Sequence, residues 1–275
     1  MDEERRPVDE ERTFDLLRRA EKGLEITTRD DQYDFTAFLD ASGAARRNGG
    51  RLRLLDTGRF GVFDLEWLAE AGADLFTSDE ARPNRPELGL LAKACSRGDS
   101  AIAFFMRGAV TGNGSDDVSS WGFLREIGRD GVDVHLSSRE WERDLGELAE
   151  AAHVCRKAGS RLVYYHHRAL AAGLEALAGS GGWIHLPDES FEDPDSRIIL
   201  SDIISAASAA GSGVVLHLEK AHPVEALRDY LDAGATLLFG TPPSDPRTLL
   251  GSVEEAVRKR RLDRRSYYIH ASFLP

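Results

Sequence analysis

Histidine occurs at equivalent places near the ends of four short apolar segments of this sequence. A neutral imidazole nitrogen binds divalent metals, and imidazole also takes up and releases protons near neutral pH. Histidines at equivalent positions therefore indicate a chemical site if the fold brings the segment ends together. The four candidates are His135, His167, His185 and His217, with His166, one residue earlier in its segment, as the alternative to His167.

Carboxylates stand near the ends of the same kind of segment. Asp56 and Asp79 follow two earlier segments, and Glu219 lies two residues after His217. Side chains of a strand alternate between its two faces, so Glu219 and His217 are expected to share one face. We expect Glu219, Asp56 and Asp79 to act as acid–base groups or to orient an imidazole.

Arginine follows three segments in the middle of the chain, at Arg107, Arg139 and Arg168. The planar guanidinium suits a carboxylate or a phosphate, so these residues are candidate substrate anchors. Ion pairing of each arginine with a loop carboxylate is the alternative interpretation.

Short, almost continuously apolar segments alternate with helix-like segments from residue 51 onward, which is typical of buried parallel strands. Eight such units predict an α/β fold of the (β/α)₈ barrel type, in which functional residues lie at the carboxyl ends of the strands. A doubly wound open sheet is the alternative. The expected strands are Leu52–Asp56, Asp74–Thr77, Ala101–Phe105, Val132–Leu136, Arg161–Tyr165, Gly182–Leu186, Gly213–Leu218 and Thr236–Phe239.

The two ends of the chain differ from this pattern. Residues 1–50 are expected to form an N-terminal helical extension with helices over Val8–Leu24 and Tyr33–Arg47, and residues 51–275 the barrel domain. Tyr267–Phe273 has the composition of an extra strand after the last helix.

Composition limits the function classes. The chain has 275 residues, a formal net charge of −12 and only two cysteines, and its N-terminus is charged rather than apolar. These features predict a cytoplasmic protein with no membrane segment, no disulfide framework and no nucleic-acid surface. A small-molecule substrate is the expected partner, and a homo-oligomer is a further possibility.

The site residues support three hypotheses. The first is a metal-dependent hydrolase or lyase in which zinc, iron or manganese bound by the four histidines polarises a small polar or anionic metabolite. The second is a metal-independent enzyme of the aldolase or isomerase kind that uses histidine and glutamate as acid and base. The third is a non-catalytic barrel that serves as a binding or assembly subunit.

Overall fold

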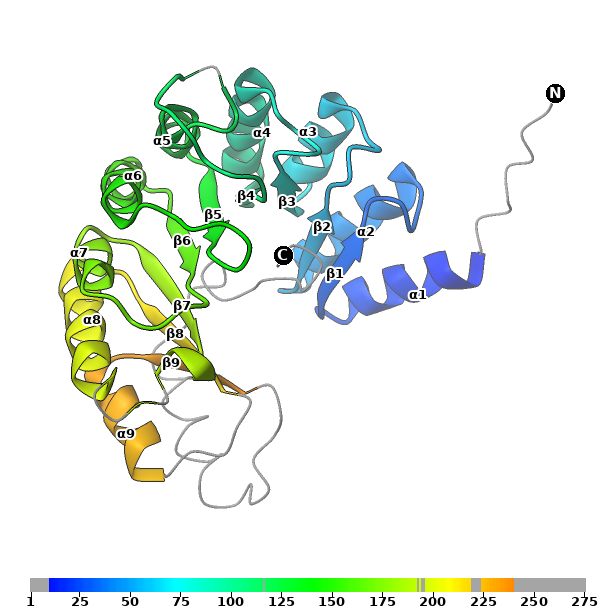
Figure 1. Cartoon of the computed structure of the whole chain (residues 1–275). Helices are drawn as coiled ribbons and strands as arrows, with labels where there is room; N and C mark the ends of the chain where they lie inside the picture. The colour runs from blue at the N-terminus through cyan, green and yellow to red at the C-terminus, as the bar shows by residue number, and fades with distance from the viewer. Residues whose placement is uncertain (1–9, 116, 192, 194–195, 219–223, 240–275) are drawn as a thin grey trace. The chain divides into compact units, whose positions relative to one another are not determined.

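Parallel strands and helices alternate along the whole described part of the chain. The computed structural model describes residues 10–115, 117–191, 193, 196–218 and 224–239. Within these residues one parallel sheet has its strands in sequential order, from β1 to β9 (Figure 1). A doubly wound sheet reverses its strand order at a switch point, which does not occur here. The fold is therefore the expected α/β fold of the (β/α)₈ barrel type.

The chain divides into two compact units. The first is Met1–Phe105 with Asp130–Val132, and the second is Met106–Arg129 with Asp133–Pro275. The elements up to the boundary are α1 (Glu10–Glu21), β1 (Glu25–Arg29), α2 (Phe35–Arg47), β2 (Arg51–Leu55), α3 (Val62–Glu70), β3 (Asp74–Ser78), α4 (Arg85–Gly98) and β4 (Ile102–Met106).

The second unit continues the alternation, and its helices α6, α7 and α8 lie along one side of its strands (Figure 1). Its elements are α5 (Trp121–Arg129), β5 (Asp133–Ser137), α6 (Leu145–Ala158), β6 (Leu162–Tyr165), α7 (Gly173–Gly179), β7 (Trp183–Pro187), the 3₁₀ turn η1 (Asp188–Ser190), α8 (Ser196–Ala210), β8 (Val214–Leu218), α9 (Val224–Ala233) and β9 (Thr236–Phe239).

Local signals in the sequence explain where several helices begin and end. The Asp144 carboxylate accepts backbone N–H groups of Gly146 and Glu147 at 2.8 and 3.0 Å and thereby caps the start of α6. The glycines that separate helices from strands have positive φ, a conformation that glycine adopts without steric cost. They are Gly72, Gly159, Gly211 and Gly234, with φ between 74° and 117°.

Each of the eight strands expected from the sequence overlaps one of the strands β2 to β9. The structure adds β1, which pairs in parallel with β2 from Glu25 opposite Arg51 to Arg29 opposite Leu55. The N-terminal helical extension expected over residues 1–50 therefore also contains a strand, which lies between the helices α1 and α2. Only Ile26 of β1 is buried, so this edge strand has no apolar run that would reveal it. The strand expected at 267–273 lies outside the described residues.

Strands β5 to β8 have two chemically different faces. One face carries buried apolar side chains such as Val134, Leu136, Ile184 and Leu216. The parallel pairing places His135, Tyr165, His185 and His217 together on the opposite face. The sequence therefore builds an apolar layer on one side and a row of aromatic polar rings on the other.

None of the described helices combines the length and the apolar composition needed to cross a bilayer.

Candidate functional site

Two histidines from neighbouring strands form a direct imidazole–imidazole hydrogen bond. His185 Nδ1 on β7 lies 2.9 Å from His217 Nε2 on β8, and their ring centroids are 5.2 Å apart. His185 is buried, whereas His217 is only partly buried. One nitrogen of the pair carries the shared proton and the other accepts it. A proton taken up at His217 can therefore be shared with His185.

A tyrosine supports this pair from the side of β6. The Tyr165 ring lies 4.7 Å from the His185 ring, centroid to centroid, and its hydroxyl lies 2.8 Å from His135 Nδ1 on β5. Burial raises the pKa of Tyr165 well above its usual value of 10, with a further contribution from Asp133. The phenol therefore keeps its proton, and we infer that its hydroxyl donates to His135.

Two histidines of this face, His135 and His217, are neutral at pH 7. Burial, together with the charge of Arg161, lowers the pKa of His135 to about 3. Burial also lowers the pKa of His217 from 6.5, and the nearby negative charge of Asp188 opposes that shift. A neutral imidazole is the form that can accept a proton from a substrate or donate an electron pair to a metal.

We expect the stability of the fold to fall with acid because of His135. An unfolded histidine binds a proton near pH 6.5, whereas folded His135 does so only near pH 3. Its contribution is complete above pH 6.5 and is lost as the pH falls. Between pH 7 and pH 5 this residue alone lowers the free energy of unfolding by about 2 kcal/mol.

Urea unfolding at these two pH values measures the effect. In His135→Gln the difference in unfolding free energy between pH 7 and pH 5 should shrink by about 2 kcal/mol. His153→Gln, at an exposed position of α6, is the matched control and should keep the wild-type difference. If the difference in unfolding free energy between pH 7 and pH 5 is the same in His135→Gln as in His153→Gln, burial does not lower the pKa of His135 and the prediction is wrong.

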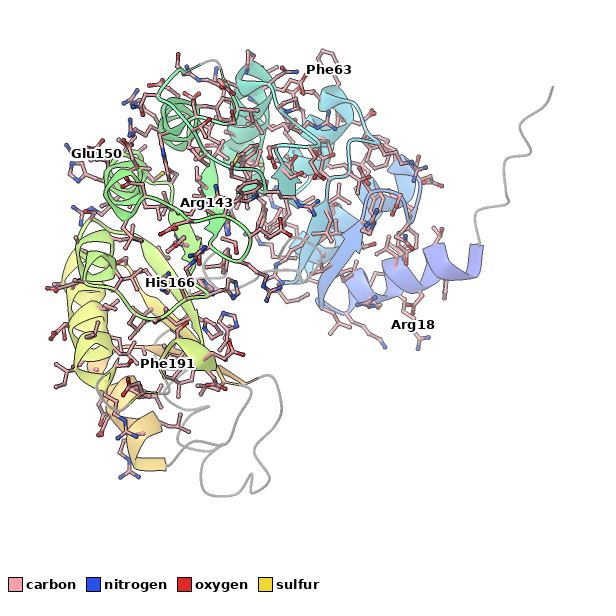
Figure 2. The ribbon with its side chains drawn as sticks, viewed as in Figure 1. Arg18, Phe63, Arg143, Glu150, His166 and Phe191 are labelled. Carbon is pink, nitrogen blue, oxygen red and sulfur yellow. The ribbon has the colours of Figure 1, made fainter. Side chains whose placement is uncertain are left out.

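The two adjacent histidines after β6 have different roles. His166 is buried, and its Nε2 donates to the carbonyl of Ala169 at 3.0 Å, so it holds its own loop (Figure 2). His167 has the strand phase of Tyr165, and its backbone N–H donates to Ser138 Oγ at 2.9 Å. Of the two, His167 is thus the one in phase with the other site histidines.

The three candidate arginines lie in different surroundings. Arg168 is half exposed and lies 3.8 Å from the Glu142 carboxylate. Arg139 is exposed, and its charge acts on His167. Arg107, just after β4, is partly buried.

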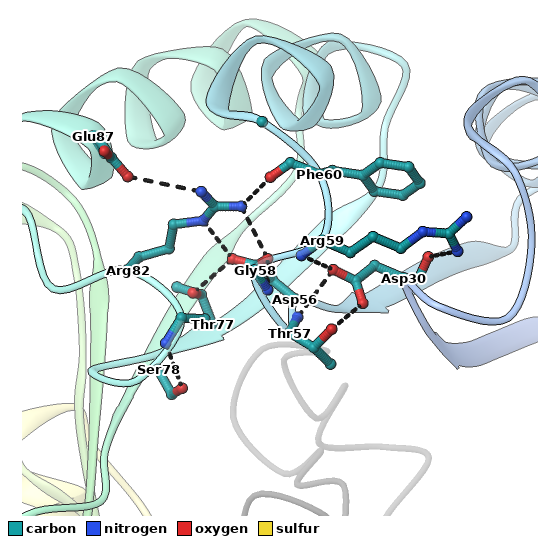
Figure 3. A network of polar contacts seen from close by, with 12 residues as sticks. Asp30, Asp56, Thr57, Gly58, Arg59, Phe60, Thr77, Ser78, Arg82 and Glu87 are labelled. Atoms are coloured by element: carbon teal, nitrogen blue, oxygen red, sulfur yellow. Dashed lines mark hydrogen bonds and ion pairs between the residues drawn. The ribbon is translucent and has the colours of Figure 1, made fainter. Parts of the chain in front are cut away.

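The carboxylates of the first unit are engaged in a separate network (Figure 3). The Asp56 carboxylate is buried and accepts hydrogen bonds from Arg82 Nε and Nη2 at 2.9 and 3.1 Å. It also accepts one from the Thr77 hydroxyl at 2.8 Å. This bidentate pair fixes the loop after β2 and leaves the Asp56 carboxylate little capacity for proton transfer. Asp79 is partly buried and belongs to the same unit, while Glu219 lies outside the described residues.

The described residues offer only part of a metal site. No group of three or more histidine, cysteine or acidic side chains among them could hold a metal ion. The facing nitrogens of His185 and His217 are a pair, whereas protein zinc sites use three or four protein ligands. The described part of the chain therefore does not fit the metal centre expected from the sequence, and no chemical step is derived through one.

Several residues of this site lack a signal in the sequence that would single them out. Tyr165 stands in an apolar strand and reads as a core residue, although its phase matches that of the histidines. Asp188 follows β7 directly and is buried. Arg143 is buried in the loop after β5, where its Nε donates to the Ser137 carbonyl at 3.0 Å (Figure 2). No spacing rule distinguishes Arg143 from the many surface arginines.

Comparisons with known proteins give similarity of structure only. No protein-family model matches the chain, and no curated protein matches its sequence. An HpcH/HpaI aldolase/citrate lyase family protein from Burkholderia cenocepacia has a TM-score of 0.35 at 16% identity, over 90% of this chain and 99% of that one. A 3-dehydroquinate dehydratase from Aquifex aeolicus has a TM-score of 0.36 at 10% identity, over 86% and 97%. At these TM-scores the similarities support no statement about activity.

Proposed function

We propose that this protein is an acid–base enzyme of the lyase or isomerase kind that acts on a small polar or anionic metabolite. The observation that carries the proposal is the 2.9 Å contact between the imidazoles of His185, in the middle of β7, and His217, the last residue but one of β8. In barrels of this type the carboxyl ends of the strands hold the chemistry. The expected partner is therefore a small molecule; a homo-oligomer stays a prediction.

His217 is the residue that meets the substrate in this proposal, because it is less buried than His185. It removes a proton from the carbon next to a carbonyl, and the electron pair of that C–H bond passes into the carbonyl to give an enolate. The proton rests on the imidazole pair and is later returned to the product. Asp188 stabilises the charged pair, since its negative charge favours the imidazolium form of His217.

Proton exchange with solvent tests the proposal without knowledge of the natural substrate. Small 2-oxo acids, with pyruvate as the first, are incubated with the protein in D₂O, and their carbon-bound protons are followed by ¹H NMR. We expect faster loss of these protons than in protein-free buffer for at least one acid of the panel. Exchange no faster than in buffer for every acid would contradict the proposal.

The metal-dependent hydrolase or lyase is the second candidate. It is favoured by one observation, the two imidazole nitrogens that face each other in the His185–His217 pair. Dialysis against EDTA and metal analysis separate the two candidates. If the enzyme is metal-independent, proton exchange persists after dialysis against EDTA. If it is metal-dependent, activity disappears and returns with zinc, iron or manganese, and His185→Ala and His217→Ala lose the bound metal.

A further inference from the structure

The two nitrogens of the His217 ring have different surroundings. Nε2 lies 2.9 Å from Nδ1 of His185 and is occupied by that contact. For the other nitrogen, Nδ1, the described part of the chain supplies no hydrogen-bond partner. His217 is only partly buried, whereas His185 is 2% exposed. Nδ1 is therefore the nitrogen of the pair that is left for a substrate at His217.

The position of one hydrogen decides whether Nδ1 can act as a base. A neutral imidazole has one N–H and one nitrogen with a free electron pair. If the hydrogen of His217 is on Nε2, it is donated to His185 and the electron pair lies on Nδ1. If His185 donates instead, His217 must hold its hydrogen on Nδ1 and offers a substrate no electron pair. Only the first arrangement makes His217 a base.

The surroundings of His185 hold its ring in place as a hydrogen-bond acceptor. The strand register puts Tyr165 of β6 opposite His185, and the two ring centroids are 4.7 Å apart with the planes inclined by 53°. Tyr165 is itself fixed, because it is buried and its hydroxyl lies 2.8 Å from His135 Nδ1. The His185 ring therefore cannot turn away from His217 without displacing a buried tyrosine.

The carboxylate closest in effect to His217 does not hold a hydrogen on Nδ1. Asp188 acts on His217 through its negative charge, and no hydrogen bond joins these two described side chains. A carboxylate bonded to Nδ1 would require the hydrogen on that nitrogen. The acceptor that the described residues place against His217 is thus His185 Nδ1, which favours the hydrogen on Nε2.

We propose that His185 is a positioning residue that accepts the Nε2 hydrogen of His217 and thereby makes Nδ1 of His217 the base. This inference rests on the proposed function and adds to it the atom that takes the proton. In the reaction the C–H bond of the substrate breaks, its proton forms an N–H bond with Nδ1, and the electron pair passes into the carbonyl. The Nε2 hydrogen stays bonded to His185, so the ring keeps its orientation until the proton returns to the product.

Long-range ¹H–¹⁵N correlation NMR of the intact, histidine-labelled protein at pH 7 identifies the tautomers without any substrate. We expect His217 with its hydrogen on Nε2 and His185 with a bare Nδ1. His185→Asn should keep this tautomer of His217, because the asparagine carbonyl can accept the same hydrogen. His185→Leu has no acceptor, so His217 should show both tautomers. His153→Asn, at an exposed position of α6, is the matched control and should resemble the wild type.

Deuterium incorporation into the 2-oxo acid that exchanges in the wild type gives the functional readout. His185→Leu should slow it by about 10 to 100-fold, the usual loss when the partner that orients an active-site imidazole is removed. His185→Asn should stay within about threefold of the wild-type rate, because the acceptor is restored. Urea midpoints of both variants show whether the fold is retained.

Two results would overturn the assignment. One is a wild-type His217 that carries its hydrogen on Nδ1, and this result does not depend on any variant. The other is a His185→Asn rate as low as that of a folded His185→Leu, or a His185→Leu rate equal to that of His153→Asn. Failure of the proposed function looks different: the wild-type tautomers are as expected, which supports the direction of the hydrogen bond, but no 2-oxo acid exchanges its protons.

Discussion

Replacing Asp56 with alanine is expected to lower the free energy of unfolding by about 3–5 kcal/mol. Asp56 is completely enclosed and accepts two hydrogen bonds from Arg82, which is itself buried. The substitution leaves the buried guanidinium of Arg82 with the more distant and partly exposed Glu87 carboxylate, 3.8 Å away, as its counter-charge. The loss comes mainly from this poorly compensated buried charge and not from the attraction of the original pair. Urea unfolding at pH 7 measures it.

An exposed ion pair of the same unit provides the control. Glu70 lies 2.6 Å from Arg97, and both side chains are about half exposed. Glu70→Ala should cost at most about 1 kcal/mol, because surface pairs are solvated and contribute little. Replacing Asp56 and Arg82 together, as Asp56→Leu with Arg82→Met, should recover part of the loss. A cost for Asp56→Ala no larger than that for Glu70→Ala would contradict the structural role assigned to Asp56.

The second large effect is expected at His217. His217→Gln should slow deuterium incorporation into pyruvate by about 10² to 10⁴-fold, the usual contribution of a general base. Glutamine can keep a hydrogen bond to His185 Nδ1, but it cannot accept a proton at neutral pH. The substitution therefore removes the proton transfer and preserves the contact between the strands.

Two measurements separate a chemical effect from a structural one at this position. Circular dichroism and the urea midpoint of His217→Gln should stay close to those of the wild type. His153→Gln, which changes a histidine on the exposed side of α6, should leave the exchange rate unchanged. An exchange rate in His217→Gln within about twofold of the wild-type rate would exclude His217 as the base.

Much of the fold could be predicted because its strands are buried on both faces. Continuous apolar runs followed by helices with glycine after their last residue define β2 to β9. β1 could not be predicted in this way, because only one of its five residues is buried. What identifies Glu25–Arg29 as a strand is its pairing with β2, and such pairing is a tertiary contact that no local pattern encodes.

The candidate site could be predicted only where strand phase decides it. Alternation predicted one common phase for His135, His185 and His217, and the strand register places them on one face. It left the choice between His166 and His167 open, and the structure distinguishes the two by the contact of His166 with the Ala169 carbonyl. Alternation could not show that a tyrosine stands between His135 and His185. Alternation also could not show which arginine pairs with Asp56, because the folded loops bring these two side chains together.

The hydrogen-bonded imidazole pair can be observed directly by ¹⁵N NMR of the histidine-labelled protein as a function of pH. If His185 and His217 are joined as described, one N–H is shared between Nδ1 of the first and Nε2 of the second, and the His217 ring stays neutral at pH 7 and just below pH 6.5 because its pKa is lowered. Two rings that titrate independently near pH 6.5, with no shared N–H, would contradict the pair and with it the proposed acid–base site.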